Sequence, residues 1–286
     1  MITVFTPSYN RKKELSILYS SLLNQEKDIF EWLIIDDGSS DDTKEYITKL
    51  KKEAKIKINY IYKENGGKQS AYNVGLSNAK GDIFLCIDSD DILKDNILKE
   101  IKDDFTKIKD NPNIAGLVYL QGYINNKDKI IGTDFPEDNL ETNYFDLYHK
   151  FKVTGDKLII LKTSVAKEYY FPLIKGEKFV PEALIFNRIS KKYNFLCLNK
   201  VASYKEYLEG GYSSNYFNLV KRNPLSNRLY FKELYLMEKT IYNVYGYILF
   251  SIYGKVKFNE MLKEHPAKIL IIILYLPVLF VSKIRK

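Results

Sequence analysis

The sequence predicts an α/β fold, in which a mixed, mostly parallel sheet is flanked by helices and followed by a helical C-terminal extension. Three observations predict it. Short apolar segments alternate with amphipathic helical segments through residues 1–110, polar residues directly follow several of the apolar segments, and the chain becomes rich in aromatic helical segments from residue 216 onward. Alternating strands and helices are typical of a parallel sheet with helical crossovers.

The first four strands and their helices follow one another in a regular order. An apolar strand at 2–6 is followed by a helix over 11–25, in which leucines recur at helical spacing. Further strands are expected at 32–35, 56–62 and 83–88, with helices reaching residue 54 and beginning near Lys68. Because right-handed crossovers place the loops after parallel strands at one sheet edge, that edge is the expected ligand site.

The fourth strand, 83–88, begins with the apolar run 83–87 and leads into the acidic segment Asp88-Ser89-Asp90-Asp91. An apolar run of this length is typical of a strand that is buried on both faces. Its three carboxylates repel one another unless a cation lies between them, and a divalent metal carrying phosphate oxygens would meet that need. The alternative is a solvated acidic turn, since Asp and Ser favour turns.

The second half of the chain is expected to add strands, two further helices and the C-terminal region. A helix near 145–151 is predicted, and Pro181 fits the first turn of a second helix, which places Glu182 at its N-terminus. Residues 1–215 are expected to form one domain and 216–286 a helical region. Strands are expected at 115–120, 129–132, 158–161 and 195–198.

Composition narrows the function classes. The 286 residues are 45% hydrophobic, which is enough for a large core, and the two cysteines and two histidines form no metal-like or nucleophilic pattern. Carboxylate chemistry is therefore expected. The net charge of +8 indicates an anionic partner. Nucleic acid is not the expected one, because Lys and Tyr are spread along the chain without a recognisable module. No signal-peptide pattern follows Met1, which predicts a cytoplasmic location.

Four motifs together resemble the family 2 glycosyltransferases with a GT-A fold. They are Thr6-Pro7-Ser8-Tyr9-Asn10-Arg11, Asp36-Asp37-Gly38-Ser39, Gly66-Gly67-Lys68 and Asp88-Ser89-Asp90-Asp91. The resemblance lies in their order and spacing over residues 1–110, and it is weaker over 176–214. It implies an inverting enzyme that moves a sugar from a nucleotide-sugar, with a UDP-sugar expected, to a glycan or lipid-linked acceptor in bacterial-type surface polysaccharide synthesis.

The resemblance also implies which residues contact the nucleotide. Thr6, Pro7 and Ser8 would pass its base, and Asp37, together with Asp36, would accept a hydrogen bond from a uracil-type ring. Each of these residues directly follows or ends a predicted strand.

The same resemblance implies how the diphosphate is held. Lys68 would lie near the base or the diphosphate, Asp88 would face the ribose or the metal, and Asp90 would bind Mn²⁺ or Mg²⁺. Asp91 could exchange roles with either carboxylate. Further groups that could complete the diphosphate pocket are Tyr204, Lys205, Glu206 and the loop Gly210-Gly211-Tyr212-Ser213.

An inverting transferase needs a carboxylate that takes the proton of the acceptor hydroxyl. Glu182 matches the position of the family's later acidic motif, and a helix N-terminus would favour its charged form. The family often shows two adjacent acids there, whereas Pro181 precedes Glu182 here, so Glu177 is a rival. The alternative interpretation is that Glu182 only stabilises the first turn of a helix.

Two other function classes fit the sequence less well than a transferase does. An inactive scaffold subunit of a membrane glycan-assembly complex would gain nothing from like charges crowded at an empty site. A dinucleotide-dependent oxidoreductase would need a Gly-x-Gly-x-x-Gly turn after the first strand, where this chain has Thr-Pro-Ser-Tyr-Asn.

The apolar segment Ile269–Val281 predicts a further partner. As a helix its 13 residues would be about 20 Å long, too short for the roughly 30 Å core of a bilayer. Together with the nearby lysines it is expected to lie in one leaflet of an anionic membrane, which makes the protein peripheral at the inner face. The alternatives are a buried helix or an oligomer contact.

Overall fold

The structure, a computed structural model, describes residues 1–206 and 216–284. These residues divide into two compact units. The first contains 1–171 and 185–206, and the second contains 172–184 and 216–284. The second unit therefore includes a short segment from the middle of the chain, which the shift in composition near residue 215 does not indicate.

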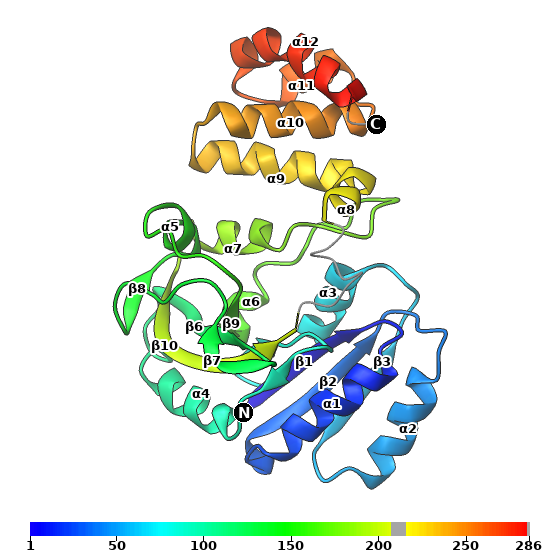
Figure 1. Cartoon of the computed structure of the whole chain (residues 1–286), viewed down its shortest axis with the longest axis vertical. Helices are drawn as coiled ribbons and strands as arrows, with labels where there is room; N and C mark the ends of the chain where they lie inside the picture. The colour runs from blue at the N-terminus through cyan, green and yellow to red at the C-terminus, as the bar shows by residue number, and fades with distance from the viewer. Residues whose placement is uncertain (207–215, 285–286) are drawn as a thin grey trace. The chain divides into compact units, whose positions relative to one another are not determined.

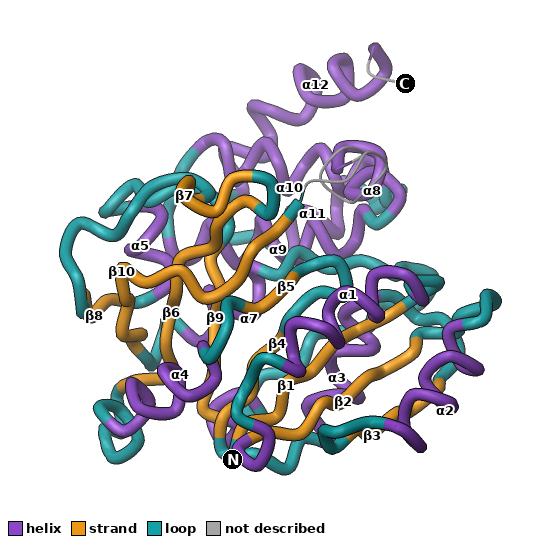
Figure 2. The backbone as a smooth tube through the Cα atoms, turned by 60° about the horizontal axis from the view of Figure 1, so that its bottom comes forward, coloured by secondary structure: helices purple, strands orange, loops and turns teal. Residues whose placement is uncertain are grey.

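The first unit contains one mixed sheet with the order β3-β2-β1-β4-β9-β6-β10-β5, in which β7 also pairs with β6 and β8 with β10 (Figures 1 and 2). Strands β1 to β4 are parallel neighbours, and β9 is antiparallel to both β4 and β6, so that β6 and β10 run in the same direction as β1. The predicted mostly parallel α/β sheet is thus confirmed. The strands are β1 (Ile2–Ser8), β2 (Phe30–Asp36), β3 (Ile58–Tyr62), β4 (Ile83–Cys86), β5 (Ile92–Leu93), β6 (Ile114–Tyr123), β7 (Asn126–Ile130), β8 (Leu140–Thr142), β9 (Lys157–Lys162) and β10 (Asn194–Lys205).

Helices cover both faces of the parallel part of this sheet (Figures 1 and 2). The helices before β10 are α1 (Lys12–Leu23), the 3-10 helix η1 (Lys27–Ile29), α2 (Thr43–Glu53), α3 (Lys68–Asn78), α4 (Ile97–Thr106), α5 (Tyr144–His149), α6 (Thr163–Ala166) and α7 (Ala183–Ile189). The second unit adds α8 (Tyr216–Arg222), α9 (Pro224–Met237), α10 (Ile241–Tyr253), α11 (Phe258–Glu264) and α12 (Lys268–Ile284).

The alternation of side chains along the strands builds two separate core layers. Val4 and Trp32 pack in one buried cluster with Leu18 of α1 and residues of α2 and α4. On the other face, the ring of Phe5 stacks on Phe84 at 5.4 Å, and Tyr72 of α3 meets both rings edge-on. Because both faces are covered, β1 and β2 are buried along their whole length, as their mostly apolar sequence indicates.

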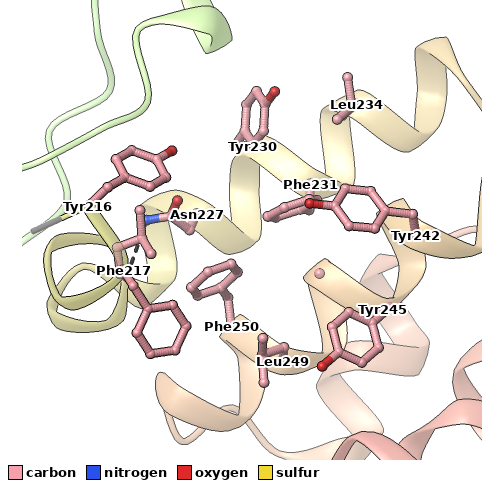
Figure 3. A pocket seen from close by; sticks show the side chains of 12 residues that line it. Tyr216, Phe217, Asn227, Tyr230, Phe231, Leu234, Tyr242, Tyr245, Leu249 and Phe250 are labelled. Carbon is pink, nitrogen blue, oxygen red and sulfur yellow. Dashed lines mark hydrogen bonds between the residues drawn. The ribbon is translucent and has the colours of Figure 1, made fainter. Parts of the chain in front are cut away.

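The second unit has its own core between α9, α10, α11 and α12. It also contains a pocket of about 400 Å³ among α8, α9 and α10, and aromatic side chains of these helices surround the space (Figure 3). They include Tyr216, Phe217, Tyr230, Phe231, Tyr242 and Phe250. The aromatic composition of this region thus builds both a helical core and a cavity beside it.

Candidate active site

The ends of the first four strands lie at one edge of the sheet, as the sequence predicts. Ser8 is level with Asp36 in the pairing of β1 with β2, and the next amide, of Asp37, donates to the Ser8 carbonyl oxygen at 2.8 Å. On the other side of β1, the amide of Ile87 donates to the Phe5 carbonyl oxygen at 2.9 Å. The acidic segment that begins at Asp88 therefore starts beside the loop that follows β1.

Asp37 organises the loop after β3. Its Oδ1 accepts hydrogen bonds from the Lys63 ammonium at 2.6 Å and from the amide of Gly66 at 2.9 Å. Its Oδ2 accepts from the amide of Gly67 at 2.7 Å and from Asn65 Nδ2 at 3.1 Å. Gly67 has a φ of 90°, which suits glycine, and helix α3 begins at the next residue. Asp37 thus fixes the start of α3.

The other residues expected near the base also have partners inside the chain. Asp36 is fully buried, and its two oxygens accept from the Ser39 amide at 2.8 Å and the Tyr60 hydroxyl at 2.6 Å. Thr6 Oγ1 accepts from Trp32 Nε1 at 3.0 Å. The Ser8 hydroxyl is buried without a hydrogen-bond partner in the described part of the chain. These residues and Pro7 are buried at the edge of the sheet. Contact of each with a nucleotide stays a prediction.

Asp88 is held by two lysines from distant elements. The Lys68 ammonium, at the start of α3, lies 2.6 Å from Asp88 Oδ1, and the Lys205 ammonium, at the end of β10, lies 3.9 Å from Asp88 Oδ2. Burial raises the pKa of this carboxyl, but the attraction of Lys68 and Lys205 outweighs burial and holds the pKa below its ordinary value. Asp88 is therefore ionised near neutral pH.

Lys205 joins three carboxylates. Its ammonium lies 3.9 Å from Asp91 Oδ2 and 3.4 Å from Asp156 Oδ2, besides its contact with Asp88. Burial alone would lower the pKa of this ammonium, but Asp91, Asp88 and Asp156 together raise it above its ordinary value. A cation that stays charged at the end of β10 can attract phosphate oxygens.

Asp91 and Asp90 differ in their surroundings. Asp91 is 3% exposed; Gln121 Nε2 donates to its Oδ2 at 3.4 Å, and its Oδ1 has no hydrogen-bond partner among residues 1–206 and 216–284. Burial, together with Asp88 and Asp90, raises the pKa of Asp91 well above its ordinary value, against the opposing effect of Lys205. Asp90 is half-buried and forms no hydrogen bond or ion pair in the part of the chain that the structure describes.

The donor set suits a hard divalent cation only in part. Asp88 and Asp90 offer carboxylate oxygens, the ligands that Mg²⁺ and Mn²⁺ prefer. The described residues contain no group of three or more His, Cys, Asp or Glu side chains placed to hold a metal ion. Two carboxylates fit a metal whose remaining ligands are phosphate oxygens and water, as Mg²⁺ sites commonly have.

The two candidate bases belong to the second unit. Glu182 directly precedes α7, and the amide of Leu184 donates to the Pro181 carbonyl oxygen at 3.0 Å, so Glu182 is at a helix start as predicted. Glu177 binds the N-terminus of α9, where its oxygens accept from the amides of Leu225 at 2.6 Å and Ser226 at 2.7 Å. Glu177 thus has a structural role, and catalysis by either acid stays a prediction.

The residues expected to complete the diphosphate pocket lie in different surroundings. Lys205 lies beside the acidic segment, whereas Glu206 accepts from Asn125 Nδ2 at 3.0 Å and the ring of Tyr204 lies under the Lys127 ammonium at 5.1 Å. The loop Gly210–Ser213 lies outside the described residues.

Three residues of this site are not among those predicted from the sequence: Lys63, Gln121 and Asp156. Lys63 follows β3 directly, so the same argument from strand ends would have found it. Gln121 lies inside β6 and Asp156 before β9, and no local pattern distinguishes them from surface residues.

A model of the family described as Glycosyl transferase family 2 matches residues 3–169 of the chain. The chain belongs to this family. The match covers the four strand ends, Lys68 and the whole acidic segment, so the recognised motifs and the geometry of the site agree.

Similar proteins place this family 2 glycosyltransferase among bacterial relatives. An uncharacterized glycosyltransferase of Haemophilus influenzae is 25% identical over 92% of this chain and 84% of its own. An uncharacterized glycosyltransferase of Nostoc sp. is 32% identical over 46% of this chain and 39% of its own. The poly(ribitol-phosphate) beta-N-acetylglucosaminyltransferase TarS of Staphylococcus aureus is 33% identical over 34% of this chain, which spans only 18% of TarS.

Solved structures confirm the GT-A fold. TarS residues 1–349 of S. aureus in complex with UDP-GlcNAc align with a TM-score of 0.60 and 19% identity, covering 97% of this chain and 90% of the other. The mannosyltransferase PcManGT from Pyrobaculum calidifontis in complex with GDP-Man and Mn²⁺ aligns with a TM-score of 0.55 and 15% identity, covering 99% and 83%.

Proposed function

We propose that this family 2 glycosyltransferase moves a sugar from a nucleoside diphosphate sugar to a glycan or lipid-linked acceptor, with inversion at the anomeric carbon. The acidic segment at the end of β4, which lies between Lys68 and Lys205, carries the proposal. It combines oxygen ligands for a divalent cation with two ammonium groups at the sheet edge where ligands of α/β sheets bind. A uridine nucleotide is the proposed donor, as the resemblance to family 2 implies and as the UDP-GlcNAc complex of TarS supports.

Asp88 and Asp90 would hold the metal, for which Mn²⁺ and Mg²⁺ are the candidates, as the Mn²⁺ complex of the PcManGT neighbour supports. Such an ion supplies Lewis-acid neutralisation of the diphosphate leaving group. Lys68, whose ammonium lies 2.6 Å from Asp88 Oδ1, would offer a positive charge to a phosphate oxygen. Lys205 would keep a positive charge beside the same leaving group.

The transfer itself exchanges one bond for another. The acceptor oxygen attacks the anomeric carbon from the face opposite the diphosphate, the bond from that carbon to the phosphate oxygen breaks, and the diphosphate leaves with the electron pair. Glu182 is the proposed base that takes the proton of the acceptor hydroxyl. Surface polysaccharide synthesis and a cytoplasmic location remain predictions for this chain.

The experiment that tests the proposal is a screen of nucleotide-sugars for release of nucleoside diphosphate, with and without Mn²⁺, Mg²⁺ and a chelator. We expect one uridine nucleotide-sugar to be turned over in a metal-dependent way. The absence of turnover of every donor by a folded protein that also fails to bind nucleoside diphosphates would support the inactive scaffold instead.

A further inference from the structure

Helix α12 uses one of its faces for the core of the second unit. Ile271 and Val278 are buried, and the ring of Tyr275 lies 4.6 Å from that of Phe258 in α11. These residues pack in the cluster that also contains Val244 and Ile248 of α10. An amphipathic helix in a globular unit buries one apolar face in this way.

The opposite face of α12 is also apolar, and it is exposed. Ile269, Leu276 and Phe280 are 74%, 72% and 67% exposed, although a helix that is apolar all round is normally covered on all sides. The exposed residues recur three or four positions apart and so form one stripe along the helix. This outer stripe consists of Ile269, Ile272, Ile273, Leu276, Phe280 and Ile284.

The length of α12 limits what can cover this stripe. Its 17 residues correspond to about 25 Å of helix. Among residues 1–206 and 216–284, no helix has the length and apolar character needed to cross a membrane. A surface that covers the stripe would contact it from the side.

The charge of the chain indicates the nature of that surface. Residues 216–286 contain 12 Lys and Arg but 4 Asp and Glu, a net charge of +8, which equals the net charge of the whole chain. The preceding 215 residues contain 32 of each sign and are neutral overall. Helix α12 itself carries Lys268 and Lys283 and no acidic residue. A second copy of this region would meet it with the same positive charge, whereas anionic lipid would attract it.

We propose that α12 lies in the plane of an anionic lipid leaflet, with the outer stripe among the acyl chains and Lys268 and Lys283 at the phosphate level. Long lysine side chains can reach headgroups while an adjacent apolar face is immersed. The attachment does not depend on the transfer reaction, so it can fail while donor turnover persists. It adds a location to the proposed function, since it would hold the enzyme where lipid-linked acceptors are found.

The first test measures binding of the full chain to phosphatidylglycerol vesicles and to phosphatidylcholine vesicles by co-sedimentation. We expect stronger binding to phosphatidylglycerol, which weakens as salt is added. Ile273→Gln and Leu276→Gln should each lower the partition coefficient about tenfold, because each removes one large apolar side chain from the lipid. Leu236→Gln is the matched control: this α9 residue of the same unit is 55% exposed but lies outside the stripe, and its change should have no effect.

The second test measures how deeply α12 enters the lipid leaflet. Phe280→Trp places an indole in the stripe, and lipids brominated on their acyl chains should quench its emission when the vesicles are anionic. The unchanged protein is the control, because Trp32, the only tryptophan of the chain, is fully buried in the first unit and should not be quenched.

Two outcomes would overturn the proposal. One is binding to phosphatidylglycerol that Ile273→Gln and Leu276→Gln leave unchanged in proteins with normal thermal unfolding. The other is a stable dimer that these two substitutions convert to a monomer, with no affinity for vesicles in any form, which would assign the stripe to a second copy of the chain.

Discussion

At the scale of single residues, the acidic segment divides into carboxylates with different surroundings. Asp88 is paired with Lys68 and Lys205, and Asp91 is buried against Gln121. Asp90 is half-buried without an ion pair in the described residues, so it can accept a metal without first losing a partner. Asp90 is for this reason the residue at which metal binding can be tested most directly.

We predict that Asp90→Asn lowers both metal affinity and turnover at least about 100-fold. Even changes in groups that only orient a metal ligand cost about 10- to 100-fold, and loss of a ligand should cost no less. The measurement is nucleoside diphosphate release as a function of Mn²⁺ concentration. Asp82→Asn is the control, because Asp82 is exposed at the other end of β4 and should leave turnover unchanged. Full activity of Asp90→Asn would remove this residue from the metal site.

His265 is expected to make the stability of the second unit depend on pH. Its Nδ1 accepts from the amide of Ala267, its ring lies 4.4 Å from that of Tyr247, and it is 1% exposed. Burial, together with the charges of Lys232 and Arg228, lowers its pKa from 6.5 to about 4.

Between these two values the unfolded chain binds a proton that the folded chain does not. The free energy of unfolding should therefore fall as pH decreases from 6.5 to 4, by at most about 3 kcal/mol from this group. His265→Phe keeps a ring but cannot titrate, so it should show a smaller decrease over this range in denaturant unfolding followed by circular dichroism. Equal pH dependence in the two proteins would contradict the prediction.

At the scale of elements, two helix N-termini are associated with the two candidate bases. Glu177 satisfies the first amides of α9, whereas Glu182 precedes α7 directly. A carboxylate that satisfies the amides at a helix N-terminus stabilises the helix through hydrogen bonds and through the helix dipole. Glu177 therefore has a structural role that unfolding experiments can measure, whereas the role proposed for Glu182 is catalytic.

We predict opposite phenotypes for the two substitutions. Glu177→Gln should lower the free energy of unfolding by about 1 to 2 kcal/mol, because the amide loses charge and one acceptor, while transfer by the folded protein persists. Glu182→Gln should leave donor binding near normal and reduce transfer by about 10² to 10⁴. Thermal unfolding, donor affinity and turnover of both variants distinguish the structural role from the catalytic one. If Glu177→Gln loses transfer and Glu182→Gln does not, Glu177 is the base.

The elements that could be predicted from sequence are those with a strong local signal. Strands β1, β2 and β4 are mostly apolar, and α1 has apolar residues at helical spacing, so these elements lie near the bounds that the sequence predicts. The two-residue β5 and the three-residue β8 depend on pairing with β10, which local sequence does not reveal. For the same reason Gln121, on a long buried strand, could not be recognised as a neighbour of Asp91.

At the scale of the whole molecule, the two units differ in charge and in what they are expected to bind. The first contains the carboxylates and lysines of the candidate site, and the second contains the aromatic pocket and the outer stripe of α12. A ligand that binds only the folded first unit should stabilise that unit alone.

We therefore predict that nucleoside diphosphate with Mn²⁺, at about 100 times its dissociation constant, stabilises the first unit by about 2.7 kcal/mol. This corresponds to a rise of about 5 to 10 °C in its melting temperature. Emission of Trp32 reports this unit, and circular dichroism reports the helices of both. The unfolding transition of the second unit, which circular dichroism detects but Trp32 emission does not, should remain at its original temperature. An equal rise of both melting temperatures would mean that the two units unfold together.

The bonds from Asp37 to the amides of Gly66 and Gly67 also determine how a diphosphate can be bound. In dinucleotide-binding proteins the positive end of the first helix dipole is left open and receives the pyrophosphate. Here the N-terminus of α3, the third helix of the sheet, already holds an anion that belongs to the protein, the carboxylate of Asp37. A phosphate placed there would meet like charge, so under the proposed function we expect the diphosphate to bind lysine ammonium groups and a divalent ion instead of the N-terminus of α3. If the diphosphate is bound in this way, its affinity for the protein should fall when the divalent ion is removed.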